Sequence, residues 1–254
     1  MKTPESRIFF IGFLNEWPDG LKRFLPVTAV VLICLFAGLG FSVSATQDDP
    51  GDGSFRFDLG RQELTGVVYA KPYPHLWITE GNENFRAGHV MMLSGSGKRG
   101  AMAAVLEDAQ LTKVQGVPLT RGDLDMLQLA GGQRKPVAVD GVAPDLPGDR
   151  DLGRWRLTGE ICDGKCLAGA MRPGIGLAHK ACANLCLIGD IPPVFAATGA
   201  VEGAKFFLMA GPDGGPMPAS MYDFTAVLIE VEGTITARGD LMIFQIDPDT
   251  MKIL

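Results

Sequence analysis

The sequence predicts a mainly β protein. One N-terminal transmembrane helix precedes two tandem small β-barrels, and the second barrel carries a short helical cysteine-rich insertion. Three observations lead to this fold class. An uncharged apolar run stands near the N-terminus, and two different motifs each occur twice in the same order. Most of the remaining chain consists of short β-branched or alternating runs between glycines and prolines, which is typical of strands.

The composition argues against several classes of function. The 254 residues carry a formal net charge of −6 without a cluster of Lys or Arg, so a nucleic-acid-binding face is not expected. Only three Tyr and three Trp are present, too few for a platform that stacks bases. Neither a Ser/His/Asp order nor a glycine-rich phosphate loop occurs. No catalytic residue is indicated, and the sequence favours a protein that is not an enzyme.

The apolar run is Phe24–Val43, FLPVTAVVLICLFAGLGFSV, whose 20 uncharged residues can cross a bilayer core of roughly 30 Å. We therefore predict a transmembrane helix at residues 24–44. Lys22 and Arg23 directly precede it, and basic residues stay on the cytoplasmic side of a bacterial inner membrane. Residues 1–23 are thus expected in the cytoplasm and everything beyond the helix in the periplasm. The alternative is a cleaved signal peptide, because the run ends in an acceptable Val-Ser-Ala cleavage motif.

A polar segment follows the predicted helix. Residues 45–55 contain TQDDPGDGS and are rich in Gly, Pro and Asp, which predicts a flexible tether between the membrane and the folded body. Export matters for the cysteines farther along the chain, because the bacterial periplasm is oxidising.

The two recurring motifs indicate a duplicated domain. Asp58–Gly66 (DLGRQELTG) and Asp151–Gly159 (DLGRWRLTG) are identical at seven of nine positions. Farther along, Arg121–Leu124 and Arg238–Leu241 both have the sequence Arg-Gly-Asp-Leu and predict a hairpin turn before a last strand. We place the first β-barrel repeat at residues 56–130, a linker at 131–150, the second repeat at 151–254, and a cysteine-rich insertion within the second repeat at 160–195.

Each copy has the pattern of a small barrel of about five short strands, similar to an OB-fold. Glycines and prolines separate the strands in both copies. The expected strands of the first copy are Leu64–Tyr69, His89–Leu93, Gln110–Val117 and Asp123–Leu129. Those of the second copy are Lys205–Met209, Thr225–Ile235 and Leu241–Ile246. The sequence thus predicts two tandem OB-like β-barrels.

The insertion holds four of the five cysteines and one of the three histidines: Cys162, Cys166, His179, Cys182 and Cys186. Leu177–Ile188 has helical composition and is followed by Gly189, a typical helix stop. On that helix His179, Cys182 and Cys186 stand at i, i+3 and i+7, which places them on one face. The other two cysteines are expected on a loop that could converge with this face.

Three interpretations of the cluster compete. Two structural disulfides, pairing Cys162 and Cys166 with Cys182 and Cys186, fit an oxidising compartment. Alternatively, the four thiolates, or three of them with His179, suit a metal: tetrahedral zinc, an iron–sulfur cluster, or copper if the chain's methionines take part. The third interpretation is a thiol–disulfide redox role, although no Cys-x-x-Cys is present. No cofactor is certain from the sequence.

The second repeat also resembles a group of small bacterial exported OB-like domains. The shared pattern is D-x-K-C, a spacer, H-x-x-C-A-x-x-C, Gly and Ile-Pro, then strands with a V-x-V-x-G motif. The matching residues are Asp163, Lys165, Cys166, His179, Cys182, Ala183, Cys186, Gly189, Ile191, Pro192, Ile229, Val231 and Gly233. Ile229 departs mildly from the pattern, and the resemblance covers roughly residues 157–254. It implies the fold and export, and no particular chemistry.

These observations lead to one expected function and one alternative. We expect a membrane-anchored periplasmic accessory subunit that docks on a larger membrane or periplasmic complex, such as an electron-transfer complex, with the insertion as a disulfide staple. The alternative is a metal-binding or redox protein that uses the cysteine/histidine cluster. Expected partners are the membrane and a protein complex, without nucleic acid.

Overall fold

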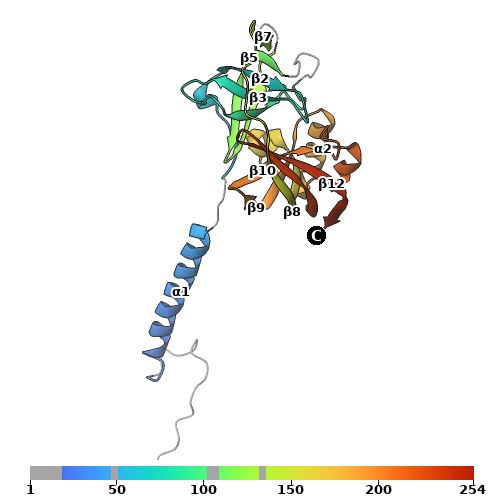
Figure 1. Ribbon diagram of the computed structural model, residues 1–254. Coiled ribbons are helices and arrows are strands. Elements are labelled where there is room, and N and C mark those ends of the chain that lie inside the picture. The colour runs from blue at the N-terminus through green and yellow to red at the C-terminus, as the bar shows by residue number, and fades with distance from the viewer. Residues whose placement is uncertain (1–18, 47–50, 102–108, 132–135) are drawn as a thin grey trace, which may run out of the picture. The chain divides into compact units, whose positions relative to one another are not determined.

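The computed structural model describes residues 19–46, 51–101, 109–131 and 136–254 (Figure 1). The chain forms two compact units, Met1–Asp49, whose described residues include one helix, and Pro50–Leu254, which contains the described strands. The protein is mainly β, as predicted from the sequence.

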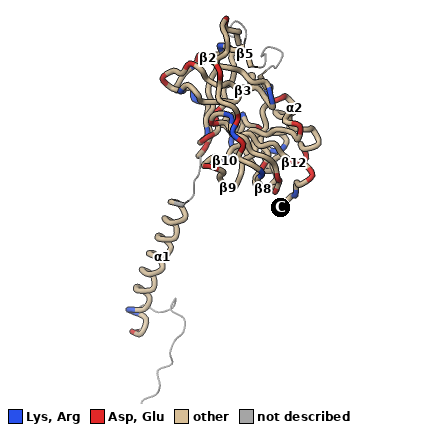
Figure 2. The backbone as a smooth tube through the Cα atoms, in the orientation of Figure 1, with Lys and Arg blue, Asp and Glu red and all other residues tan. Residues whose placement is uncertain are grey.

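The helix of the first unit is α1 (Phe24–Thr46). It begins where the sequence predicts, and Pro26 fits its first turn because the amide hydrogens there have no helical partner. Among the described residues, it is the one helix long and apolar enough to cross a membrane, with a mean hydropathy of 2.4 over Phe24–Ala45. Figure 2 shows charged residues just before the helix and none along it. A membrane anchor and a signal sequence share these properties.

The second half of the strand-rich unit is a closed barrel. Its strands are β8 (Arg150–Asp163), β9 (Pro193–Val201), β10 (Ala204–Ala210), β11 (Leu228–Arg238) and β12 (Leu241–Ile253). They close in the order β10-β12-β11-β8-β9. All pairs are antiparallel except β10 with β12, which are parallel. Large apolar side chains such as Phe195, Phe207 and Phe244 fill the interior.

The first half has the same order of neighbours. Its strands are β1 (Ser54–Phe55), β2 (Gln62–Tyr69), β3 (His75–Glu80), β4 (Val90–Ser94), β5 (Gln110–Arg121), β6 (Leu124–Leu129) and β7 (Val137–Ala138). The sheet order is β1-β5-β2-β3-β4-β6, and β5 also pairs with β6. The pair β4–β6 is parallel, like β10–β12 in the second half. The repeat detected in the sequence is therefore repeated in the strand pairing.

Short helical segments connect the strands. They are η2 (Phe57–Leu59), η5 (Cys166–Ala170), η6 (Leu177–His179), α2 (Lys180–Ile188) and η7 (Ala219–Phe224). The predicted cysteine-bearing helix matches η6 and α2, and Gly189 caps its end as expected. The expected strands do not include β3, β8, β9 or the two-residue strands β1 and β7. Prolines precede β3 and stand at the start of β9, and they favoured a loop interpretation there.

The Arg-Gly-Asp-Leu motifs form the predicted hairpin turns. In each turn two residues connect the last two strands, Gly122 and Asp123 in one half, Gly239 and Asp240 in the other. The two glycines have φ values of 58° and 60°, a left-handed conformation that glycine adopts without strain.

Each of these aspartates reaches across to the other half. Asp123 Oδ2 accepts hydrogen bonds from the backbone N–H groups of Lys205 (3.1 Å) and Phe206 (3.3 Å), at the start of β10. Asp240 Oδ1 accepts one from the N–H of Val90 (2.8 Å), at the start of β4. The two turns thus dock reciprocally on equivalent strands.

A shared apolar cluster joins the two halves. Trp77, Met92 and Met126 from the first half pack in one cluster with Val194 and Phe206 from the second. Burying a large apolar side chain contributes about 1.5–3 kcal/mol, so a cluster of this size makes the two halves one cooperative body. Consistent with this, the chain from Pro50 onward forms a single compact unit.

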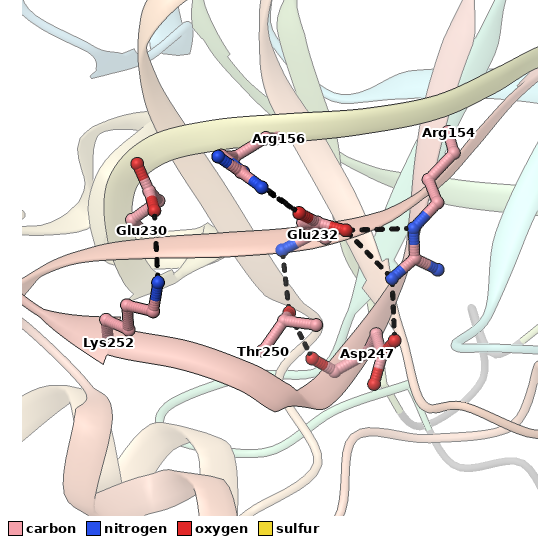
Figure 3. A network of polar contacts seen from close by, with 7 residues as sticks. All are labelled: Arg154, Arg156, Glu230, Glu232, Asp247, Thr250 and Lys252. Atoms are coloured by element: carbon pink, nitrogen blue, oxygen red, sulfur yellow. Dashed lines mark hydrogen bonds and ion pairs between the residues drawn. The ribbon is translucent and has the colours of Figure 1, made fainter.

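An ion-pair ladder lies on the outer face of the closed barrel (Figure 3). Arg156 and Arg154 on β8 pair with Glu232 on β11, and Arg154 also pairs with Asp247 at 2.7 Å. The hydroxyl of Thr250 accepts the N–H of Glu232 where the β11–β12 register shifts. Exposed pairs each contribute at most about 1 kcal/mol, so this ladder adds only modestly to the stability of the barrel.

His89 forms a charged contact between the halves. Its Nε2 lies 3.1 Å from Asp125 Oδ2 and its Nδ1 lies 2.8 Å from Asp240 Oδ2. Burial opposes protonation of the ring, but Asp125 and Asp240 outweigh it and raise the pKa of His89 to about 9. The ring is therefore an imidazolium at neutral pH.

We expect this imidazolium to make stability depend on pH. The pKa of His89 rises from 6.5 to about 9 on folding, so the contribution is complete below pH 6.5 and is lost as the pH rises through 9. Its size is on the order of 2 kcal/mol after allowance for solvent screening. Urea unfolding of the full chain in detergent measures it. His89→Gln should abolish the loss between these pH values, and an unchanged pH dependence in the variant would contradict the assignment.

Candidate metal centre

The second half positions the cysteine segment at the end of β8. That strand runs to Asp163, and the N–H of Gly164 then bonds to Pro192 O, which turns the chain into η5. A loop leads to η6 and α2, and the N–H groups of Gly189 and Ile191 return to Cys186 O at the helix end. The segment is thereby held at both of its ends.

Asp163 organises the site. Its side chain is fully buried, its Oδ1 accepts the backbone N–H of Cys166 at 2.8 Å, and its Oδ2 accepts the Nε2–H of His179 at 2.8 Å. A carboxylate only accepts, so the proton of the neutral imidazole resides on Nε2 and Nδ1 keeps a lone pair. Among the described residues, that buried Nδ1 has no hydrogen-bond partner.

Three thiols lie around this nitrogen and this carboxylate. Ligand atoms of Cys166, His179 and Cys182 lie within 4.8 Å of one another, as do those of Asp163, Cys166 and Cys186. Cys166 belongs to both groups. The predicted convergence of a loop cysteine with one face of the helix is therefore observed in two overlapping groups, one with His179 and Cys182 and one with Cys186.

Cys162 lies elsewhere. It is 1% exposed and packs in the apolar cluster between the halves, whereas Cys166, Cys182 and Cys186 belong to a separate cluster with Ile191. Burial raises the pKa of the Cys162 thiol far above its ordinary value. Successive residues of a strand face opposite sides, so Cys162 and its neighbour Asp163 point away from each other. All five cysteines are free thiols, including Cys34 in α1.

Lys98 enters the site from the first half. Its Nζ lies 2.8 Å from Cys182 Sγ and 3.7 Å from Cys186 Sγ. The hydrogen bond to Cys182 raises the pKa of Lys98, so the ammonium is retained beside the sulfur atoms. Nothing in the sequence pattern pointed to Lys98, because its place depends on how the halves pack.

The loop that carries Lys98 is fastened to the cysteine segment. The side-chain Nζ of Lys165, which is 4% exposed, donates to Gly95 O (2.7 Å) and Gly97 O (2.8 Å). The N–H of Gly100 donates to Gly189 O at 2.6 Å. A Cβ on Gly189 would overlap the carbonyl oxygen of Lys98, so this helix-capping position has no room for a side chain.

Charges in the site influence one another. Burial lowers the pKa of Lys165, while Cys186, Cys166 and Asp163 oppose that change. A hydrogen bond between Cys166 and Cys186 lowers the pKa of Cys186 and raises that of Cys166. Lys98 acts in the same direction on Cys186.

Compared with models of known protein families, with curated proteins and with solved structures, the chain matches none. The interpretation of the site therefore depends on its geometry.

We expect the cysteines to form at most one disulfide when the protein is oxidised. Cys162 lies in a different core cluster from the other three thiols of the insertion, so only a pair among Cys166, Cys182 and Cys186 can form. The intact mass of the monomer, purified without reductant, should be at most two protons light. Cys162→Ala should leave this deficit unchanged. A chain four protons light would contradict the placement of Cys162.

Proposed function

We propose that the protein binds a divalent metal ion of the zinc class through Cys166, Cys182, Cys186 and Nδ1 of His179. The buried, unpartnered Nδ1 is the observation that carries this proposal, because such an atom costs free energy unless it is paired. A ligating histidine typically donates its other ring N–H to a carboxylate, which is the contact with Asp163.

The charges of the site support a divalent ion. Three thiolates and the Asp163 carboxylate carry four negative charges. A divalent ion, Lys98 and Lys165 carry four positive charges, so the loaded site is neutral. Buried charges require this kind of compensation. Without the ion and with protonated thiols, the two lysines would face a single carboxylate.

The donor set favours zinc over the other expected ions. Three thiolates and one imidazole form a Cys₃His set, which tetrahedral zinc uses in structural sites. An iron–sulfur cluster typically uses four thiolates, and Cys162 lies outside the site. A monovalent copper ion would leave the site with a net negative charge.

Four protein ligands would close the coordination sphere. A closed site leaves no position for a water or substrate, so it supports binding and folding rather than turnover. The alternative role predicted for the cluster thereby becomes the preferred one. A disulfide staple stays a prediction only as a single bridge among Cys166, Cys182 and Cys186.

Two further proposals concern the fold and the location of the chain, and both extend expectations from the sequence. We propose that both halves are OB-like barrels, supported by their common order of strand neighbours and the parallel pairs β4–β6 and β10–β12. We further propose that α1 anchors the chain in a bacterial inner membrane with the strands in the periplasm, supported by Lys22 and Arg23 before the helix. Docking on a larger complex as an accessory subunit stays a prediction.

The metal proposal predicts one bound ion per chain. The full chain, purified anaerobically in detergent, should hold stoichiometric zinc, and removal of the ion should lower the free energy of unfolding, because binding and folding are linked. His179→Ala and Cys166→Ser should lose the ion. Cys162→Ala is the matched control and should retain it. Equal metal content in all four proteins, or none in the wild type, would refute the proposal.

A conservative substitution of Asp163 should weaken zinc binding without abolishing it. Asp163→Asn keeps the size of the side chain but removes the charge that orients His179, so zinc affinity should fall by about 10–100-fold. Competition with a chromogenic chelator measures the affinity. Asp190→Asn, a change at an exposed residue near the end of α2, serves as the control and should leave the affinity unchanged.

A further inference from the structure

An exposed apolar loop follows η5 and leads into η6. Met171 and Ile175 in this loop and Leu177, the first residue of η6, are 43%, 39% and 70% exposed, and the sequence from Met171 is MRPGIGL. Apolar side chains that gather on a short exposed segment mark a surface that a membrane or another molecule covers. The loop takes no part in the proposed metal site.

The start of the strand-rich unit packs directly against this region. A Cβ on Gly169 would overlap the backbone of Gly53 and Ser54, so the two segments are in close contact. Arg172 donates to Gly53 O at 3.2 Å and lies 3.3 Å from Asp52. The chain that comes from α1 therefore joins the folded unit beside the loop.

The length of chain before that point is short. The candidate span ends at Ala45, and Gly53 follows eight steps later (53 − 45 = 8). Eight steps of at most about 3.5 Å reach roughly 28 Å, even when fully extended. If α1 spans a bilayer, Gly53 and the loop beside it cannot lie farther than this from the membrane surface.

Charge also favours a lipid surface. From Gly164 to Gly189 the chain has no Asp or Glu, although the protein as a whole is acidic. Arg172 lies within the exposed loop, where its partner Asp52 is itself exposed, and Lys180 follows the loop. One carboxylate from outside the segment, that of Glu160, accepts the N–H of Gly176 in the loop. Basic side chains beside apolar ones suit the anionic headgroups and acyl boundary of a bacterial membrane.

We propose that Met171, Ile175 and Leu177 insert into the headgroup–acyl boundary of the bilayer that holds α1, with Arg172 at the anionic headgroups. This inference rests on the proposed membrane anchor and is independent of the metal site. It makes the loop a second, reversible membrane contact that fixes one face of the strand-rich unit toward the lipid.

Photolabelling of the full chain in vesicles tests this inference. The vesicles contain equal parts phosphatidylethanolamine and phosphatidylglycerol, with a trace of phospholipid that carries a diazirine in its acyl chain. Mass spectrometry of the labelled peptides should find lipid on α1 and on the peptide with Met171–Leu177. The triple variant Met171→Asp, Ile175→Asp, Leu177→Asp should lose the loop label and keep the α1 label.

Control variants distinguish the outcomes. Val142→Asp changes a 95% exposed apolar residue outside the loop and should leave both labels in place. Leu177→Asp alone should reduce the loop label, and its unfolding midpoint and metal content should match the wild type.

Label on α1 without label on the wild-type loop would overturn the inference and leave the anchor standing. No label on either segment would overturn the anchor itself. A cross-link from the loop to a polypeptide in native membranes would assign the loop to a protein partner instead.

Discussion

The apolar core shared by the two halves is the constraint on which the rest of the structure depends. Trp77 and Met126 bury their surface against Val194 and Phe206, and the aspartates of the two hairpin turns cross the same boundary in opposite directions. Reciprocal contacts between equivalent surfaces are the geometry of a two-fold symmetric dimer. Here the two copies are covalently joined, so the interface forms within one chain.

The cysteine site depends on that interface as much as on its own sequence. Asp163 connects β8 to η5 and η6 through its two oxygens, and this fixes the tautomer of His179. Lys98, which comes from the other copy, places its ammonium beside the sulfur of Cys182. A buried carboxylate and a buried ring nitrogen without a partner are each costly, and the proposed ion would compensate both.

Local pattern predicted much of the fold and part of the site. An α-helix has 3.6 residues per turn, so residues three apart such as His179 and Cys182 lie on one face. The Arg-Gly-Asp turns were recognisable because two-residue hairpins need glycine. Cys162 was grouped with the site because nothing in the sequence shows that β8 continues through it, and strand alternation then turns it into the core. Lys98 could not be predicted, since its position follows from contacts between copies.

The contacts that hold the Lys98 loop on the cysteine segment show that the site depends on both copies. The copy without cysteines supplies the ammonium and the carbonyl oxygens that bind Lys165, and it meets Gly189 where no side chain fits. The first copy therefore contributes directly to the site. The thiols and the imidazole come from the second half, whereas the ammonium beside them comes from the first, so a change in how the halves pack would alter the charge around the sulfur atoms.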